Sequence, residues 1–302
     1  MSRATAALLS AAAVLLVVAA AVLAAGGSSE APSQGESGAG PTPDTEALPR
    51  PREPIPRDPD RLAVLLADDG TFRLNDAIDR WIAEGTSRGG PPREVSLLGL
   101  YQQRIYLLLG GRRRLARSVL ARLPARVKPA ARDVLAARGA LQVLNPPTRR
   151  RRFTTGRALP AGRLLRLYRR AERRFGVQWE LLAAVNFVET GFNKIRSNST
   201  AGAQGPMQFI PSTWDAYGMG GNIRDPRDAI MGAANYLRAS GAPGNVGRAL
   251  FAYNPSSLYV TAVRRYARRI RLDRRAFYAF YSWQIFVRTP AGSRRLTGPR
   301  PL

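Results

Sequence analysis

The sequence predicts a mostly α-helical protein built from two helical domains. Apolar residues recur at spacings of three and four along most of residues 61–290, which is the period of helices with one buried face. Glycines and prolines interrupt this pattern, for example at Gly85 and Pro124, and so separate individual helices. Hydrophobic residues make up 45% of the 302 residues, which is enough to bury a core. We expect a small helical accessory domain at residues 61–147 and a second helical domain at residues 155–290.

The first 60 residues differ in composition from the rest of the chain. Arg3 precedes a mostly apolar stretch, Ala4 to Ala25, which as a helix would be about 33 Å long, against about 30 Å for the core of a bilayer. Small residues at its end also suit a cleavage site. We expect residues 1–25 to be a cleaved signal peptide or a retained membrane anchor, and the rest of the chain to be extracytoplasmic, in the cell wall or periplasm. Glycine, serine and proline dominate residues 26–60, which predicts a disordered linker.

The accessory domain is predicted to contain five amphipathic helices. No pattern in them points to chemistry, so we expect the domain to be dispensable for any reaction. Their arginine-rich faces are expected to be solvated or to meet an anionic polymer. The stretches read RLAVLLADD, LNDAIDRWIAEG, REVSLLGLYQQRIYLLL, RRRLARSVLARL and KPAARDVLAARGALQVL.

The second domain is predicted to contain seven helices and a polar, glycine-rich loop at residues 193–205 that has room for a short hairpin. Asp225 and Asp228 flank Pro226 in the pattern of a capped helix start, so we expect both carboxylates to be structural. Residues 291–302 are expected to form a flexible tail. The predicted helices cover residues 161–175, 177–190, 206–216, 226–239, 245–253, 256–270 and 273–286.

Composition limits the possible functions. The chain has 47 basic and 21 acidic residues, a net charge of +26, which implies anionic surroundings such as nucleic acid, lipid headgroups or cell-wall polymers. It has no cysteine and no histidine, which excludes thiol nucleophiles, histidine-based triads and the usual zinc sites. We expect no metal and no cofactor, so any catalysis would depend on carboxylates, hydroxyls, amides or arginines.

One acidic residue, Glu189, continues the apolar face of a predicted helix. At 100° per residue it falls within about 20° of Leu182 and about 40° of Val185, and Gly191 follows at the helix end. Burial and the negative end of the helix both disfavour a charged carboxylate, so we expect a raised pKa, which a general acid needs. The alternative is a glutamate at the helix end that points into solvent.

Two later segments have groups that could complete a site. Gly202 and Gly205 bracket a tight loop that allows a ligand to approach the backbone, and Gln208 offers an amide just beyond it. Tyr253 and Asn254 lie at the end of a predicted helix, where an aromatic ring and an amide suit a sugar ring. Tyr253 could equally belong to the core.

Five segments, taken in order, resemble lytic transglycosylases, bacterial enzymes that cleave peptidoglycan with a lysozyme-like, mostly helical domain. They are ETGFN, the Ser-x-x-Gly-Ala-x-Gly loop, GPMQFIPSTW, DPRDAI and YNPSSLYVTAV. The resemblance covers residues 160–272 and is greatest to the membrane-bound B type and its actinobacterial relatives. Pro206 stands where the soluble type usually has leucine, and YNPSS replaces its YNAG; both differences fit the B type better.

The resemblance implies a role for each candidate residue. Glu189 matches the catalytic acid, Ser199 and Gln208 match groups near the acid and the cleft, and Tyr253 and Asn254 match the pair that faces the bound sugar. The implied substrate is the glycan strand of peptidoglycan, cleaved at the β-1,4 bond between N-acetylmuramic acid (MurNAc) and N-acetylglucosamine (GlcNAc). The implied product is a 1,6-anhydro sugar, formed without water and with a single carboxylate.

Other functions remain open from the sequence. A hydrolytic muramidase would use the same Glu189 together with a water near Asp215, and Asp273 is the other loose candidate for a partner acid. A non-catalytic peptidoglycan-binding protein could use the same scaffold. Anionic cell-wall polymers or a membrane surface are the expected partners of the basic surface. No interleaved basic and aromatic motif supports specific nucleic-acid binding, and no obligate protein partner is inferred.

Overall fold

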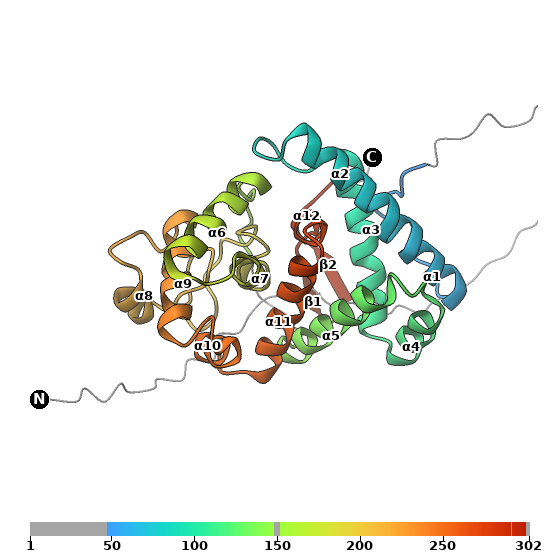
Figure 1. Ribbon diagram of the computed structural model, residues 1–302. Helices are drawn as coiled ribbons and strands as arrows, with labels where there is room; N and C mark the ends of the chain where they lie inside the picture. The colour runs from blue at the N-terminus through green and yellow to red at the C-terminus, as the bar shows by residue number, and fades with distance from the viewer. Residues whose placement is uncertain (1–46, 148–151, 291, 300–302) are drawn as a thin grey trace, which may run out of the picture.

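Helices make up most of the structure, as the sequence predicts (Figure 1). The computed structural model describes residues 47–147, 152–290 and 292–299. Within these ranges no helix is long and apolar enough to cross a membrane. The predicted signal peptide or anchor, residues 1–25, lies outside the described residues.

The N-terminal region is helical and begins at a clear cap. The side chain of Asp58 accepts a hydrogen bond from the backbone N–H of Arg61 at 2.8 Å, and Pro59 takes the first helical position, where its fixed φ fits. The elements are α1 (Pro59–Ala67), a π-helical turn η1 (Asp68–Arg73), α2 (Leu74–Glu84), α3 (Arg93–Gly110), α4 (Arg113–Arg122) and α5 (Lys128–Leu144).

The C-terminal region contains the other helices and one small hairpin. Asp225 caps α9 as predicted, because its side chain accepts hydrogen bonds from the backbone N–H groups of Arg227 and Asp228. The elements are α6 (Ala161–Phe175), α7 (Trp179–Thr190), α8 (Pro211–Tyr217), α9 (Pro226–Ala239), α10 (Val246–Tyr253), α11 (Ser257–Leu272), α12 (Arg275–Ser282), β1 (Phe286–Thr289) and β2 (Gly292–Arg295).

Helix α7 is the central helix of this region. The sequence pattern predicts a helix with one apolar face, but in the structure α7 is buried on every side. Every residue from Leu181 to Thr190 is buried, because α6, α9, α11 and α12 all pack against it. A helix that is covered on all sides has no solvent face for a charged residue to turn toward. The alternative in which Glu189 points into solvent is therefore wrong.

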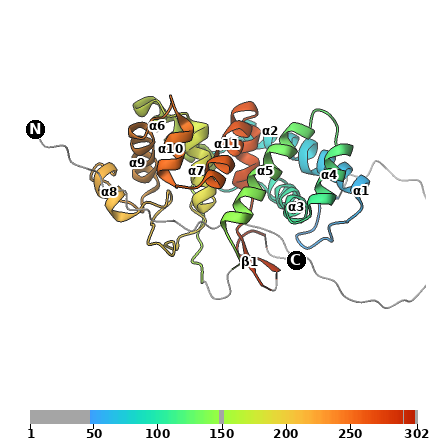
Figure 2. The ribbon, with the colours of Figure 1, turned by 90° about the horizontal axis from the view of Figure 1, so that it is seen from below.

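One hydrophobic core runs through both helical regions. Helices α5 and α11 lie side by side in both views of the ribbon (Figures 1 and 2). Asp133 of α5 is only 1% exposed, and it accepts hydrogen bonds from Arg265 and Arg268 of α11. Trp81 of α2 packs edge-on against Tyr278 of α12, with ring centroids 5.4 Å apart. The two stretches predicted as separate domains therefore share one core.

The last predicted helix, residues 273–286, ends earlier than the sequence pattern indicates. The helix α12 stops at Ser282, and the backbone becomes extended at Trp283. The ammonium of Lys194 binds the carbonyl oxygens of Tyr281 and Trp283 at this point, so it satisfies acceptors that a helix end leaves open.

The prediction of a flexible tail at residues 291–302 is wrong for residues 292–297. Strand β2 pairs antiparallel with β1. Beyond β2, the backbone N–H of Leu296 donates to the carbonyl of Ile285. The backbone N–H of Ile285 in turn donates to the hydroxyl of Thr297. The GSRR sequence of β2 has no apolar alternation, so the pattern does not predict its pairing with β1, of which only Phe286 falls within a predicted helix.

Candidate active site

Glu189 lies in the last turn of α7 and is 4% exposed. Its Oε1 accepts a hydrogen bond from the hydroxyl of Tyr259 at 2.7 Å. Its Oε2 is buried and has no hydrogen-bond partner among the described residues. Buried polar atoms are almost always paired, so an unpaired carboxyl oxygen in a core marks a candidate functional group.

Burial raises the pKa of Glu189 to about 8, and the hydrogen bond from Tyr259 lowers it by a smaller amount. No other charged group in the described part of the chain contributes to this pKa shift. The rise predicted from the sequence is confirmed, and the carboxyl is mostly protonated at neutral pH. Oε1 accepts from Tyr259, which leaves Oε2, the oxygen without a partner, available to carry the proton. The side chain is therefore set up as a proton donor.

The loop after α7 is tied to the same helical turn. Asn186 and Thr190, both fully buried, donate to the carbonyl oxygen of Pro206 at 2.8 and 2.7 Å. The hydroxyl of Tyr168 in turn donates to Asn186 Oδ1 at 2.6 Å and fixes the orientation of that amide. These bonds tie the loop to Asn186, three residues before Glu189, and to Thr190, the residue directly after it, so the loop backbone is coupled to the helical turn that carries Glu189.

The loop needs glycine at position 205. Gly205 has a φ of 72°, and a Cβ there would come within 1.9 Å of the carbonyl oxygen of Ile223. Gln208 also has a positive φ, 49°, and its side-chain amide donates to the carbonyl of Gly205 at 2.9 Å. The predicted helix start at residue 206 is therefore wrong, because residues 205–209 form a tight turn and α8 begins at Pro211.

Tyr253 lies between this loop and the acid. Its hydroxyl donates to the carbonyl of Met207 at 2.6 Å, and its ring stacks on Tyr259 at a centroid distance of 6.4 Å and an angle of 2°. The charge of Glu189 is close enough to help raise the pKa of Tyr253, although burial is the larger cause. Asn254 follows at the end of α10 and is 4% exposed.

The structure places the sequence-predicted residues at different distances from the acid. Tyr253 adjoins Glu189, and Gln208 belongs to the loop that Tyr253 holds. Ser199 accepts from the backbone N–H of Ala203 at 2.9 Å, so its hydroxyl stabilises the polar loop. That loop contains isolated bridges and turns in place of the predicted hairpin.

Sequence reasoning missed Tyr259, the residue that contacts the acid directly. Tyr259 stands with Ala262, Val263 and Tyr266 at helical spacing on the apolar face of α11, and all four are buried. A tyrosine in such a row resembles an ordinary core residue. Its role becomes visible only when α11 packs against α7 and points its hydroxyl at Glu189.

Most other carboxylates of the C-terminal region have structural partners or lie on the surface. Asp273 pairs with Arg275 at 3.0 Å, Asp228 accepts from the backbone of Asn222, and Glu172 accepts from the backbone of Trp179. Asp215 is exposed on α8. No group of acidic residues in the described ranges could hold a metal ion. Two cavities, of about 490 and 480 Å³, are lined by other residues and do not include Glu189.

Residues 166–270 match the family model described as the transglycosylase SLT domain. An SLT domain therefore lies within the C-terminal region. It has the lysozyme-like, mostly helical fold that the sequence motifs predict. Tyr259, which hydrogen-bonds to Glu189, lies within the matched range, as do Asn186 and Tyr253, which hold the adjoining loop.

A curated relative supports the same assignment. The chain is 29% identical over 108 residues to a protein named membrane-bound lytic murein transglycosylase F from Thiobacillus denitrificans. The matched segment is 33% of this chain and 23% of the relative, so the chain spans about a quarter of that protein's length. A search of solved structures finds no significant match.

Proposed function

We propose that the protein is a peptidoglycan lytic transglycosylase that cleaves the MurNAc-β-1,4-GlcNAc bond and leaves a 1,6-anhydroMurNAc end. The proposal rests on Glu189, which lies within an SLT domain. Its carboxyl group is buried and mostly protonated at neutral pH, and its Oε2 has no hydrogen-bond partner among the described residues. The printed name of the relative from Thiobacillus denitrificans describes the same class of activity.

The proposed reaction needs one proton carrier that works twice. Glu189 Oε2 donates its proton to the glycosidic oxygen, the bond from that oxygen to C1 of MurNAc breaks, and GlcNAc leaves with a free hydroxyl. The sugar's own acetamido group, or an oxocarbenium-like state, holds the positive charge at C1. Glu189, now a carboxylate stabilised by Tyr259, then takes the proton from the C6 hydroxyl of MurNAc. The C6 oxygen bonds to C1, and the enzyme returns to its protonated form.

The absence of a second acid near Glu189 favours this route over hydrolysis. Most glycosidases use two carboxylates, one of which activates water or attacks the sugar. No second carboxylate of the described residues affects the pKa of Glu189, and Asp215 is exposed on α8. An internal hydroxyl of the substrate supplies the nucleophile in the proposed reaction, so no second carboxylate is required.

Substrate-binding roles for Ser199, Gln208, Tyr253 and Asn254 are part of the proposal. Tyr253 uses its hydroxyl to hold the loop, so it contributes its ring as a wall beside the acid. Gln208 and Asn254 contribute amides that suit sugar hydroxyls. Because Glu189 is 4% exposed, a glycan reaches Oε2 only when the side chains over it move.

The test compares two carboxylate variants on purified sacculi. Glu189→Gln keeps the shape of the side chain but cannot carry a proton, so turnover should fall by about 10²–10⁴-fold or more. Asp215→Asn is the matched control and should retain activity, because Asp215 lies on the surface. Wild-type turnover by Glu189→Gln would show that this residue is not the acid. Loss in Asp215→Asn would instead support the hydrolytic alternative.

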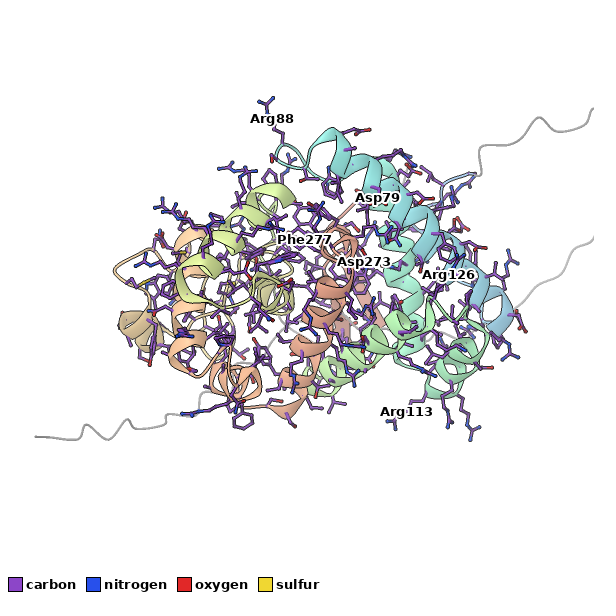
Figure 3. All side chains as sticks on the ribbon, in the orientation of Figure 1. Asp79, Arg88, Arg113, Arg126, Asp273 and Phe277 are labelled. Carbon is purple, nitrogen blue, oxygen red and sulfur yellow. The ribbon has the colours of Figure 1, made fainter. Side chains whose placement is uncertain are left out.

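We further propose that the protein works outside the cytoplasm, where its basic surface attracts anionic cell-wall polymers or membrane headgroups. The net charge is +26, and arginines such as Arg88 and Arg113 project from opposite edges of the molecule (Figure 3). Exposed charges are screened over about 8 Å at physiological ionic strength and about 3 Å at 1 M salt. Pelleting with sacculi should therefore weaken steeply with salt, while cleavage of a short neutral glycan should change little. Equal salt dependence in both assays would exclude this role.

A further inference from the structure

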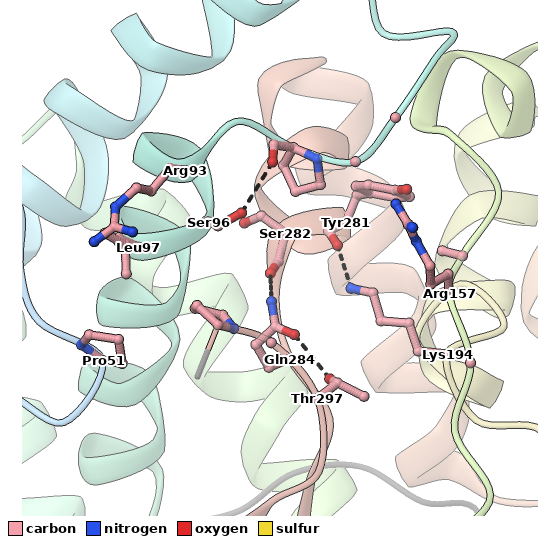
Figure 4. Close-up of a pocket in the computed structure, with 17 residues that line it drawn as sticks. Pro51, Arg93, Ser96, Leu97, Arg157, Lys194, Tyr281, Ser282, Gln284 and Thr297 are labelled. Atoms are coloured by element: carbon pink, nitrogen blue, oxygen red, sulfur yellow. Dashed lines mark hydrogen bonds between the residues drawn. The ribbon is translucent and has the colours of Figure 1, made fainter. Parts of the chain in front are cut away.

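A cavity of about 490 Å³ lies where three distant parts of the chain meet (Figure 4). The loop before α3 and the first turn of that helix form one side. Residues 156–158 and Lys194 form another, and the end of α12 together with residues after it closes the cavity. We call this space the junction cavity. Its volume lies within the range of about 300–1,000 Å³ that is usual for small-molecule sites.

The lining of the junction cavity is positively charged and has no acidic residue. Arg93, Arg157 and Lys194 line it, and no aspartate or glutamate does. Arg93 and Arg157 lie on opposite sides of the cavity, and both are exposed (Figure 4). A hollow lined by basic side chains and by no acidic one attracts an anion.

Lys194 is the best-placed cation in the junction cavity. Its ammonium donates to the carbonyls of Tyr281 and Trp283, both at 2.5 Å, and it lies 5.3 Å from the centre of the Tyr281 ring. An ammonium has three donors, so one N–H is left after these two bonds. Burial lowers the pKa of Lys194 to about 7. An anion in the cavity would supply the counter-charge that this lysine lacks.

Other polar side chains of the lining already have hydrogen-bond partners within the protein. The side-chain amide of Gln284 donates to the carbonyl of Ser282 at 2.6 Å, and its oxygen accepts from the hydroxyl of Thr297 at 2.9 Å. Apolar surface comes from residues such as Leu97 and Pro51. The basic side chains of the cavity therefore lack a negatively charged partner, and the apolar surface beside them has room for a short apolar group.

We propose that the junction cavity binds a small organic anion, with its carboxylate or phosphate oxygens against Lys194 and Arg157 and its apolar body against Leu97. Such a ligand would bridge α3 of the N-terminal region to the SLT domain and to the C-terminal segment. The proposal does not depend on the reaction at Glu189, because Glu189 is not among the lining residues.

Isothermal titration calorimetry of the full chain at low, constant ionic strength tests the proposal with three probes. They are N-acetyl-alanyl-alanine, the neutral C-terminal amide of the same dipeptide, and inorganic phosphate. We expect saturable binding of at least one anion, and binding of the amide weaker than the acid by about tenfold or more. A preference for the dipeptide assigns the site to carboxylates, and a preference for phosphate assigns it to phosphorylated ligands.

Charge-removing variants make the test specific to the cavity. Arg157→Gln and Lys194→Met should each weaken anion binding by about tenfold. Arg88→Gln is the matched control, because Arg88 projects into solvent near the same loop and does not line the cavity (Figure 3). Arg157 is exposed, so its variant keeps the test valid if Lys194→Met fails to fold. Saturable binding of the amide as tight as that of the acid, no saturable binding of either anion, or unchanged anion binding in Arg157→Gln would overturn the proposal.

Discussion

Replacing Glu189 with glutamine should stabilise the folded protein, and the gain should grow as the pH rises. Burial holds the pKa of Glu189 at about 8 in the folded state, against 4.5 for an unperturbed glutamate. Between these two values the folded state keeps a proton that the unfolded state loses, so wild-type stability falls with rising pH. Each pKa unit corresponds to 1.36 kcal/mol, so the full interval of 8 − 4.5 = 3.5 units amounts to about 5 kcal/mol. Glutamine does not titrate, and it fills nearly the same volume.

Urea unfolding of the wild type and of Glu189→Gln at pH 5, 6, 7 and 8 measures this effect. All other titrating groups are shared, so their contributions cancel in the difference between the two proteins. The difference should rise by about 1.4 kcal/mol per pH unit and level off above pH 8. Asp215→Asn, a change at an exposed carboxylate, should show no comparable trend. A constant difference between pH 5 and 8 would mean that Glu189 is charged in the folded state, and the argument for a protonated acid would fail.

Two further predictions concern Tyr259 and the N-terminal helices. Tyr259→Phe removes the hydrogen bond that favours the carboxylate, so the pKa of Glu189 should rise further. The alkaline limb of the kcat/KM profile should then move to higher pH while the rate falls by about tenfold or more; an unmoved limb would contradict this. A fragment of residues 155–302 should fail to unfold cooperatively in urea, because it exposes the faces of α11 and α12 that α5 and α2 cover. A cooperative, active fragment would show that the shared core is not needed.

The sequence predicts the position and chemistry of the acid because those depend on local pattern. Spacing alone predicts that the Glu189 carboxylate continues a row of apolar residues, close to a helix end that Gly191 marks. The same holds for the cap at Asp225, since a capping side chain bonds to backbone groups only two and three residues away. The family is recognised from the order of the five motifs, because the spacing of apolar residues alone does not distinguish one helical family from another.

Other parts of the molecule depend on contacts between distant segments. The bond between Tyr259 and Glu189 joins residues 70 positions apart, and the ion pair of Asp133 with Arg265 joins residues 132 positions apart. Helical periodicity shows that a face is apolar but not which helix covers it, so it cannot distinguish two cores from one. For the same reason the pattern cannot pair GSRR with the strand before it.

The reaction proposed at Glu189 is tested most directly by following whether water enters the products when purified sacculi are digested. Sacculi would be digested in water labelled with heavy oxygen, and the released muropeptides would be analysed by mass spectrometry beside a Glu189→Gln control. The proposed reaction uses the C6 hydroxyl of MurNAc, so the products should be lighter than reducing-end muropeptides by one water and should carry no label. Reducing ends that carry heavy oxygen, produced by the wild type and absent from the control, would show that Glu189 catalyses hydrolysis and would contradict the proposed mechanism.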